Sequence, residues 1–305
     1  MQRHLKDYLI ISFKGLAMGA ADAVPGVSGG TIAFISGIYE ELINTISNVN
    51  ISLFKTLFSQ GFKIFWKQLN GSFLLALLSG IIISFVSFMK LAKYLLEFHP
   101  ILIWSFFFGL IVASIFFVGK QITKWSATTV MALIVGAIIA FYVSKLPSLG
   151  TNESPWFLFI AGAIAICAMI LPGISGSFIL IILGAYKTLS NAIHNIDFTK
   201  IIIFVCGAIV GLLSFSHVLK WLFKHYHNIT LAILTGFIFG SLNKVWPWKN
   251  TLSWHTDSKG LETPLLQESI SPFSFNGDSQ ILFAAILMVL GFLTIFILEK
   301  LGSKK

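Results

Sequence analysis

The sequence predicts an all-α integral membrane protein built from two inverted repeats, each a re-entrant helical hairpin plus three transmembrane helices. Three observations lead to this fold class: an apolar composition, a duplicated helix-breaking motif, and six apolar runs near the length of about 20 residues that spans a bilayer. Hydrophobic residues make up 56% of the 305 residues and charged residues 11%, with a mean hydropathy of +0.87. This composition excludes a soluble domain of that size.

The duplicated motif reads V-P-G-V-S-G-G-T at residues 24–31 and L-P-G-I-S-G-S-F at residues 171–178, 147 positions later. Proline has no amide donor and glycine favours turns, so we expect each motif to interrupt a helix. The predicted break residues are Pro25, Gly26, Pro172 and Gly173. The similarity continues in four further pairs: Gly37 and Gly184, Tyr39 and Tyr186, Leu42 and Leu189, Asn44 and Asn191. Membrane proteins that break helices at symmetric places build polar sites there.

Each motif lies at the centre of a longer apolar stretch, at about 8–46 and about 156–193. Each half of such a stretch holds about 12 to 18 residues, and at about 1.5 Å per residue this is marginal for a hydrocarbon core about 30 Å thick. We therefore interpret each stretch as a re-entrant hairpin, in which one helix enters to mid-depth and another returns. Two short full crossings are the alternative.

Six apolar runs are predicted to span the membrane, at 72–96, 100–118, 127–145, 200–219, 229–246 and 280–299. These runs also repeat. Gly80 and Gly109 match Gly207 and Gly236 at an offset of 127, and Gly136 matches Gly291 at an offset of 155. The offset between matching residues falls from 147 to 127, which indicates an insertion in the first half. Its later rise to 155 indicates an added loop in the second half.

The insertion falls at about 49–70, where Lys55, Lys63 and Lys67 alternate with Phe and Trp. This pattern predicts an amphipathic helix on a membrane surface. The added loop, at about 247–279, is polar and acidic. The chain is therefore expected to form a single membrane domain, residues 1–305, with a first repeat at 1–146 and a second at 147–305.

A hairpin plus three spans is an odd number of net crossings, so the second half is expected to be inverted relative to the first. The distribution of lysines favours both termini in the cytoplasm and the 247–279 loop outside. We expect no cleavable signal peptide. The net charge of +9 then points to anionic membrane lipids and not to nucleic acid. Inverted repeats allow two mirror-related conformations, as in alternating-access transporters.

The two motifs predict an anion site. The returning helices begin near Ser28 and Ser175, and a helix N-terminus presents unpaired amides and a partial positive charge. Glycines there allow an oxyanion to approach the backbone closely. The predicted phosphate-binding residues are Ser28, Gly29, Gly30, Thr31, Ser175, Gly176 and Ser177. No cofactor and no metal ion is expected. Simple kinking and tight packing of small residues is the alternative interpretation.

Asp22 is the one carboxylate deep in the apolar part of the chain. A buried acid in a membrane is functional by default, so Asp22 is a candidate carrier of a coupling proton or sodium ion. It is otherwise a partner for Lys14 or for a backbone donor. Lys14 is a candidate charge partner in the same cavity, or it extends to the cytoplasmic surface.

The stretches A-D-A-V-P-G-V-S-G-G-T at 21–31 and I-L-P-G-I-S-G-S at 170–177 resemble the two signature motifs of the bacterial polyprenyl-phosphate transporter family, PopT, formerly a membrane domain family of unknown function. The resemblance runs over the whole chain. It implies a multi-pass protein of the bacterial cytoplasmic (inner) membrane that moves undecaprenyl phosphate from the outer to the inner leaflet. Such a flippase recycles the lipid carrier for peptidoglycan and other cell-wall polymers. By matching motif, the headgroup would bind at Ser28–Thr31 and Ser175–Ser177.

Two other functions fit parts of the sequence. A secondary transporter of a small anion would use the same site. An intramembrane serine hydrolase would use the G-x-S-G pattern at 26–29 and 173–176, but a serine nucleophile needs a base, and the histidines lie at helix ends or in loops. We therefore expect a membrane lipid transporter and not an enzyme.

Overall fold

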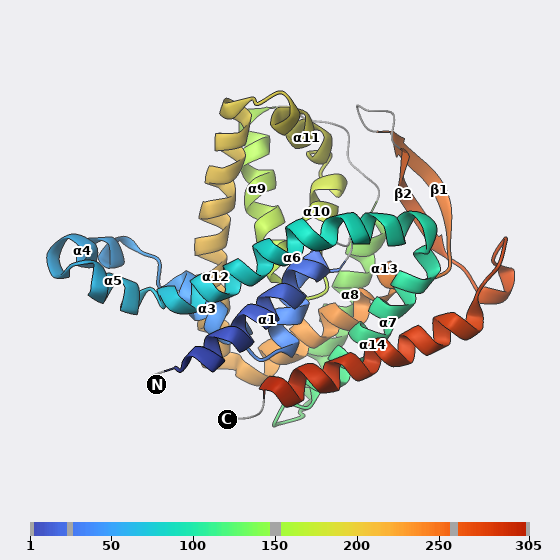
Figure 1. The fold of residues 1–305 in the computed structure, drawn as a ribbon, viewed down its shortest axis with the longest axis horizontal. Helices are drawn as coiled ribbons and strands as arrows, with labels where there is room; N and C mark the ends of the chain where they lie inside the picture. Colours follow the sequence, from blue (N-terminus) through green and yellow to red (C-terminus); the bar gives the residue numbers. More distant parts are fainter. Residues whose placement is uncertain (1–2, 23–26, 147–153, 257–261, 303–305) are drawn as a thin grey trace.

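A computed structural model describes residues 3–22, 27–146, 154–256 and 262–302. The protein is a bundle of helices with one antiparallel pair of strands at its edge (Figure 1). In chain order the elements are α1 (Leu5–Asp22), α2 (Gly29–Ile35), α3 (Tyr39–Ser47), α4 (Ile51–Gln60), α5 (Phe62–Gln68), α6 (Gly71–Phe98), α7 (Pro100–Gly119), α8 (Ala127–Lys145), α9 (Pro155–Ile170), α10 (Gly176–Ile182), α11 (Tyr186–His194), α12 (Phe198–Gly240), α13 (Leu242–Val245), β1 (Lys249–Thr256), β2 (Glu262–Ser269), a 3-10 turn (Pro272–Ser274) and α14 (Ile281–Gly302).

The predicted spans correspond to the longest helices. The first three match α6, α7 and α8, and the last matches α14. The fourth lies in α12, a run of 43 residues interrupted by non-helical dihedrals at Tyr226, and the fifth covers the end of α12 and α13. Within the described residues, four helices are long and apolar enough to cross a membrane, or up to five if the bent pair α10–α11 forms one span. The mostly helical membrane class is thus confirmed.

One part of the chain departs from the all-α prediction. The 247–279 loop contains β1 and β2, which pair antiparallel from Lys249 opposite Ser269 to Thr256 opposite Glu262. In β1, Leu252 and Trp254 alternate with polar residues, which is the period of a strand. The strands lie at the right of the bundle in Figure 1.

Several segments of the second half repeat the local structure of segments in the first. The bounds of α2 and α3 recur 147 residues later as those of α10 and α11. Gly37 and Gly184, between these helices, have the same φ of +72°. Tyr226 follows His99 by the same offset of 127, and the two residues have nearly the same dihedral angles. His99 has φ −136° and ψ 49°, and Tyr226 has φ −134° and ψ 46°.

The segment after each motif differs from the single returning helix that the sequence suggests. It bends after one short helix, because glycine adopts a positive φ that other residues resist. Between α10 and α11 the helix axis turns by 109°. The breaks predicted at Pro172 and Gly173 lie in the turn between α9 and α10, whereas those predicted at Pro25 and Gly26 lie outside the described residues.

Glycines hold the helices of each half together. A Cβ at Gly15 in α1 would collide with the carbonyl of Leu77 in α6, and Gly162 meets Phe204 in the same way between α9 and α12. Gly162 follows Gly15 by 147 positions, so both halves use the same close contact. Small residues allow helix backbones to approach closely in a membrane.

Helices of one half also pack against helices of the other. Gly109 in α7 packs against the backbone of Met288 in α14, and Gly236 in α12 packs against Leu133 in α8. A helix of the first half, α7, therefore packs on the last helix of the second half, α14. The last helix of the first half, α8, packs in turn on α12 of the second half. The largest buried cluster draws on both halves, with side chains from α1, α2, α3, α6, α7, α12 and α14.

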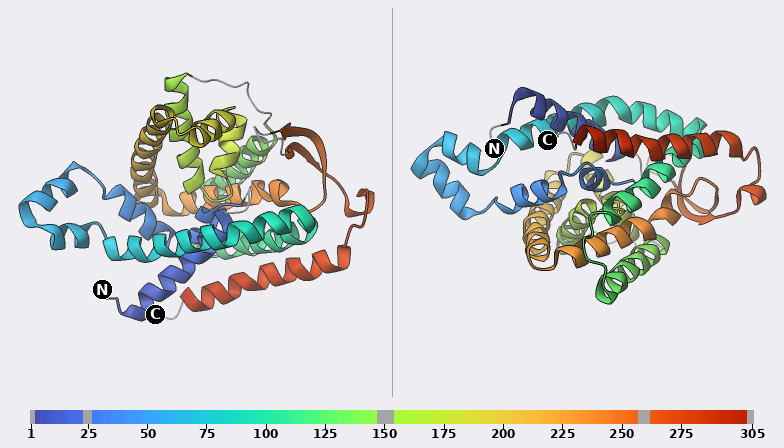
Figure 2. Two further views of the ribbon diagram at one scale, coloured as in Figure 1. Left: turned by 45° about the horizontal axis from the view of Figure 1, so that its top comes forward. Right: turned by 90° about the horizontal axis from the view of Figure 1, so that it is seen from below.

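The inserted segment forms two helices, α4 and α5, divided at Gly61, which has φ +84°. They project from the left of the bundle in Figure 1 and in both views of Figure 2, and Trp66 of α5 donates a hydrogen bond to Ser72 of α6. Phe58 is 88% exposed and Phe62 is 64% exposed. An apolar, lysine-bearing arm of this kind agrees with the predicted amphipathic character, and its membrane contact stays a prediction.

Candidate functional site

The two motifs are in contact inside the bundle. The amide of Gly173 donates a 2.9 Å hydrogen bond to Oγ1 of Thr31. The hydroxyl of Ser28 lies 3.3 Å from the carbonyl oxygen of Met169. A Cβ on Gly30 would lie 2.6 Å from the carbonyl oxygen of Ile170, so only glycine permits this approach. Both motifs therefore belong to one site.

The hydrogen-bonding groups of the first motif are paired with other groups of the protein. Ser28 takes the N-cap position of α2, and its Oγ accepts from the amide of Gly30 at 3.1 Å. The amide of Thr31 donates to the backbone carbonyl of Ser28 at 3.0 Å. Ser28 and Thr31 are 2% and 1% exposed. The free amide donors expected at this motif are thus engaged and buried.

Asp22 supplies the anion at this helix end. Its Oδ1 accepts from the amide of Gly29 at 2.7 Å, so a carboxylate occupies the place where an oxyanion was expected. Lys14 is found at the other end of α2, where its ammonium donates to the carbonyl of Ser36 at 2.6 Å. The two charges complement the two ends of the α2 dipole. The sequence left two alternative partners open for Asp22, Lys14 or a backbone donor, and the described contact of Asp22 is with the backbone donor of Gly29.

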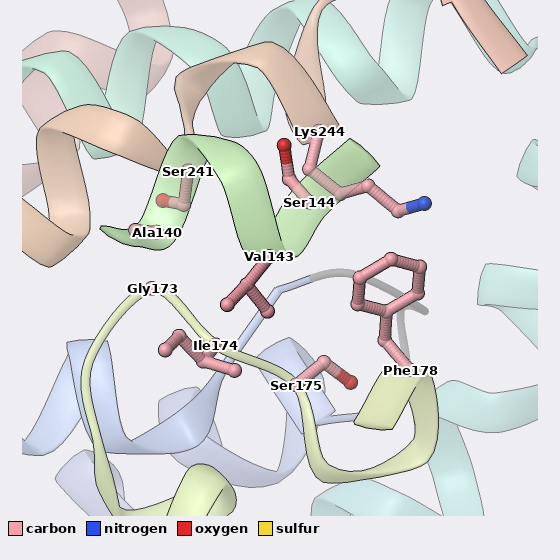
Figure 3. A pocket seen from close by; sticks show the side chains of 9 residues that line it. All are labelled: Ala140, Val143, Ser144, Gly173, Ile174, Ser175, Phe178, Ser241 and Lys244. Atoms are coloured by element: carbon pink, nitrogen blue, oxygen red, sulfur yellow. The ribbon is translucent and has the colours of Figure 1, made fainter. Parts of the chain in front are cut away.

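The second motif is open. Ser175 has the extended backbone of an N-cap but makes no capping hydrogen bond, and its Oγ lies 2.9 Å from that of Ser177. A small pocket of about 20 Å³ lies beside it (Figure 3). The lining residues are Ala140, Val143, Ser144, Gly173, Ile174, Ser175, Phe178, Ser241 and Lys244. Figure 3 shows the side chains of α8 and α13 on one side of this pocket and the turn of the motif on the other.

A larger cavity of about 310 Å³ adjoins the pocket, and Ser144, Phe178 and Lys244 line both. Its remaining lining comes from the end of α8, from α13 and from the two strands: Lys145, Leu146, Asn243, Leu252, Gln267, Glu268 and Ser269. The second motif is thereby connected to the β1–β2 side of the molecule.

Two lysines near the second motif, Lys244 and Lys249, were not predicted from the sequence as site residues. The Nζ of Lys244 lies 3.8 Å from the ring centre of Phe178, and the Nζ of Lys249 lies 4.2 Å from that of Trp104. Burial, and next the charge of Lys244, lower the pKa of Lys249 to about 7. The signal available in the sequence was a lysine on each side of Trp246-Pro247-Trp248.

Away from the two strands, α3 and α12 are in contact through two pairs of side chains. Lys220 donates to Oδ1 of Asn48 at 3.0 Å, and Nε2 of His227 lies 3.1 Å from Oε1 of Glu40. Tyr39 is 2% exposed, and its counterpart in the second half, Tyr186, is 42% exposed. The two halves therefore share local structure but differ in exposure.

The described residues contain no group of three or more His, Cys, Asp or Glu side chains that could hold a metal ion. The described partners of the Ser28 and Ser175 hydroxyls are backbone groups and Ser177, with no histidine among them. Nothing in this geometry favours a serine nucleophile, which needs an adjacent base.

The model of a family described as "Undecaprenyl phosphate translocase-like" matches residues 18–263. A protein of Vibrio cholerae serotype O1, described as a polyprenyl-phosphate transporter, is 47% identical over 302 residues, which are 98% of this chain and 98% of that protein. A protein of Staphylococcus aureus with the same description is 34% identical over 253 residues, covering 77% of this chain and 84% of its own length. No solved structure gives a significant match.

Proposed function

Because this chain belongs to the undecaprenyl phosphate translocase-like family, we propose that it transports a polyprenyl phosphate, such as undecaprenyl phosphate, across the membrane in which it sits. It is a membrane transporter and not an enzyme, in keeping with relatives that are named transporters. In our proposal the lipid moves from the outer to the inner leaflet of the bacterial cytoplasmic membrane, which recycles the carrier for cell-wall synthesis.

The observation that carries this proposal is the meeting of the two broken-helix motifs beside an open pocket. Thr31 binds the amide of Gly173, and the pocket begins at Ser175. A phosphate monoester carries about −1.5 to −2 charges at pH 7, and moving it through hydrocarbon without polar partners is very unfavourable. The motif hydroxyls and glycine amides replace water around the headgroup, while the polyprenyl tail stays in the lipid.

We place the phosphate chiefly at the second motif. Ser175 lines the pocket and Ser177 is exposed, with the buried Gly176 between them. At the first motif, Ser28, Gly29, Gly30 and Thr31 hold the second motif in position. In a conformation in which Asp22 releases the amide of Gly29, the first motif also accepts the headgroup. Protonation of Asp22, or a sodium ion bound to it, would couple that release to an ion gradient.

The asymmetry between the halves supports alternating access. The cavity lies beside β1 and β2, which we place outside the cell, and in our proposal the contacts between α3 and α12 close the other side. We interpret this as an outward-open conformation of two inverted repeats with both termini in the cytoplasm. Exchange of conformation between the repeats would bury Tyr186, expose Tyr39 and open the inner side.

A vesicle assay tests the proposal. The protein is reconstituted in liposomes that contain a labelled polyprenyl phosphate, and an impermeant reagent measures the fraction of lipid in the outer leaflet over time. We expect the parent protein to accelerate exchange and the Ser175→Ala/Ser177→Ala variant to slow it at least tenfold, and Ser28→Ala to add to that loss. Equal rates in parent, variant and empty liposomes would reject transport, and strong inhibition by inorganic phosphate would favour a small-anion transporter.

A further inference from the structure

Lys244 brings a positive charge to the mouth of the second motif. It lies in α13, a single helical turn after α12, and lines both the small pocket and the larger cavity. Its ammonium lies over the ring of Phe178, the residue directly after Ser177. In Figure 3 the Lys244 side chain extends toward Phe178, with Ser144 beside it and Ser175 across the pocket.

This charge has a neighbour of the same sign and no acidic partner among the residues that the structure describes. Lys249 is close enough for Lys244 to disfavour its protonated form. Among the described residues, the ion pairs are Arg3–Glu41, Lys200–Asp197 and His227–Glu40, and none involves either lysine. Glu268 lines the larger cavity but forms no ion pair there. Partly buried cations that repel each other are unfavourable unless an anion neutralises them.

Lys249 holds Lys244 in place. Its ammonium donates to the backbone carbonyl of Lys244, one of the carbonyls left unpaired where α13 ends. The same ammonium packs on the ring of Trp104 in α7, which links β1 to the bundle. A cation at a helix C-terminus stabilises that end. Lys249 therefore connects the start of β1 to the backbone that directs Lys244.

We propose that Lys244 binds the phosphate of the transported lipid at the junction of the two cavities, and that Lys249 is its positioning residue. The ligand class is a phosphate monoester dianion, whose charge complements the two lysines, with a hydroxyl donor from Ser175. A neutral polyprenol has no such charge and is not recognised there. This inference rests on the proposed function and assigns its headgroup contact to two residues outside the duplicated motif.

The experiment compares Lys244→Gln, Lys249→Gln and Lys244→Arg with Lys120→Gln, which removes an exposed lysine at the end of α7. Binding and transport of a short-chain polyprenyl phosphate are measured on the reconstituted full chain. We expect Lys244→Gln to raise the half-saturating concentration about tenfold or more, because a charge-assisted contact is lost. Lys249→Gln raises it less, Lys244→Arg retains most of the affinity, and Lys120→Gln equals the parent.

A second measurement needs no variant. An amine-reactive reagent labels the parent protein with and without the polyprenyl phosphate, the matching polyprenol, or inorganic phosphate, and mass spectrometry follows Lys244 and Lys120. Protection of Lys244 by the lipid phosphate but not by the polyprenol supports the assignment, and protection by inorganic phosphate as well shows that the headgroup suffices. Equal labelling of Lys244 in all arms overturns it.

The two proposals fail separately. If the parent transports the lipid but Lys244→Gln matches Lys120→Gln, the lysine assignment is wrong and the proposed function stands. If the parent binds the lipid with protection of Lys244 but does not transport it, the assignment stands and the proposed function is wrong.

Discussion

The amide of Gly173 donates a hydrogen bond to the hydroxyl of Thr31, which lies 142 residues earlier in the chain. This bond joins the two halves at the point where each interrupts its helix. Thr31 is 1% exposed, so no water replaces the contact if it is lost. A buried donor without a partner costs about 1–3 kcal/mol. The bond thus makes the geometry of each motif depend on the other.

Replacing Thr31 by Val removes the acceptor while nearly keeping the shape. We expect the free energy of unfolding to fall by about 1–3 kcal/mol and transport to fall with it, because Gly173 loses its partner. Thermal unfolding in detergent and the vesicle assay measure the two effects. Thr31→Ser keeps the hydroxyl and is the control; if both variants behaved alike, the hydrogen bond would be irrelevant.

Gly30→Ala tests the close approach of the motifs. The new Cβ would lie 2.6 Å from the carbonyl oxygen of Ile170 and 2.9 Å from that of Met169. Backbone atoms must move to admit it, so we expect a loss of about 1–3 kcal/mol in stability. Gly119→Ala is the matched control, because nothing lies within 4 Å of its Cβ. There, alanine should be neutral or stabilising by up to about 1 kcal/mol. Unfolding temperatures that rank the two variants in the opposite order would contradict this packing.

Asp22→Asn separates two roles of one carboxylate. Asparagine can still accept from the amide of Gly29, so we expect it to fold like the parent, whereas Asp22→Ala loses the 2.7 Å contact and about 1–3 kcal/mol. If Asp22 carries the coupling ion, transport by Asp22→Asn becomes independent of external pH and sodium. Rates are therefore measured at several pH values and sodium concentrations. A parent-like response in Asp22→Asn would limit Asp22 to holding α2.

The pKa of Lys249 predicts how stability changes with pH. It is lowered to about 7 in the folded protein by burial and by Lys244, whereas an unfolded lysine has a pKa of about 10.4. Between these values the unfolded chain binds more protons, so stability rises with pH in this window. The parent should gain unfolding temperature relative to Lys249→Met from pH 7 to 10. Lys120→Met is the control, and a constant difference between parent and Lys249→Met would show that the ammonium is not buried as described.

Cross-linking α3 to α12 tests the closed side. Asn48 and Lys220 are in contact in this conformation, so cysteines there, in a chain without Cys167 and Cys206, should react with a short bifunctional reagent. We expect the cross-link to stop transport, because the inner side cannot open, and cleavage of the reagent to restore it. A cross-link between Ser12 and Ala76, which join α1 to α6 within one half, should leave transport intact. Full transport by the first cross-linked protein would contradict alternating access at α3–α12.

The sequence alone was sufficient for the membrane class, the six apolar runs and the duplicated motif. These depend on composition and on local patterns, which act over one helix at a time. It also placed the second break, because Pro172 lacks an amide donor and Gly173 favours a turn. The bend at Gly37 and Gly184 was visible only as a repeated glycine, since a positive φ leaves no periodic signal.

Only the tertiary structure decided how the site is completed. It showed Asp22 on the amide of Gly29, Lys14 at the far end of α2, and Lys244 at the open motif. It also showed that α7 packs on α14 and α8 on α12. These arrangements join residues far apart in the chain, and their choice of partner depends on shape, burial and charge in three dimensions. Local patterns carry no such information, so two sequences with the same motifs can differ in which end of the site is open.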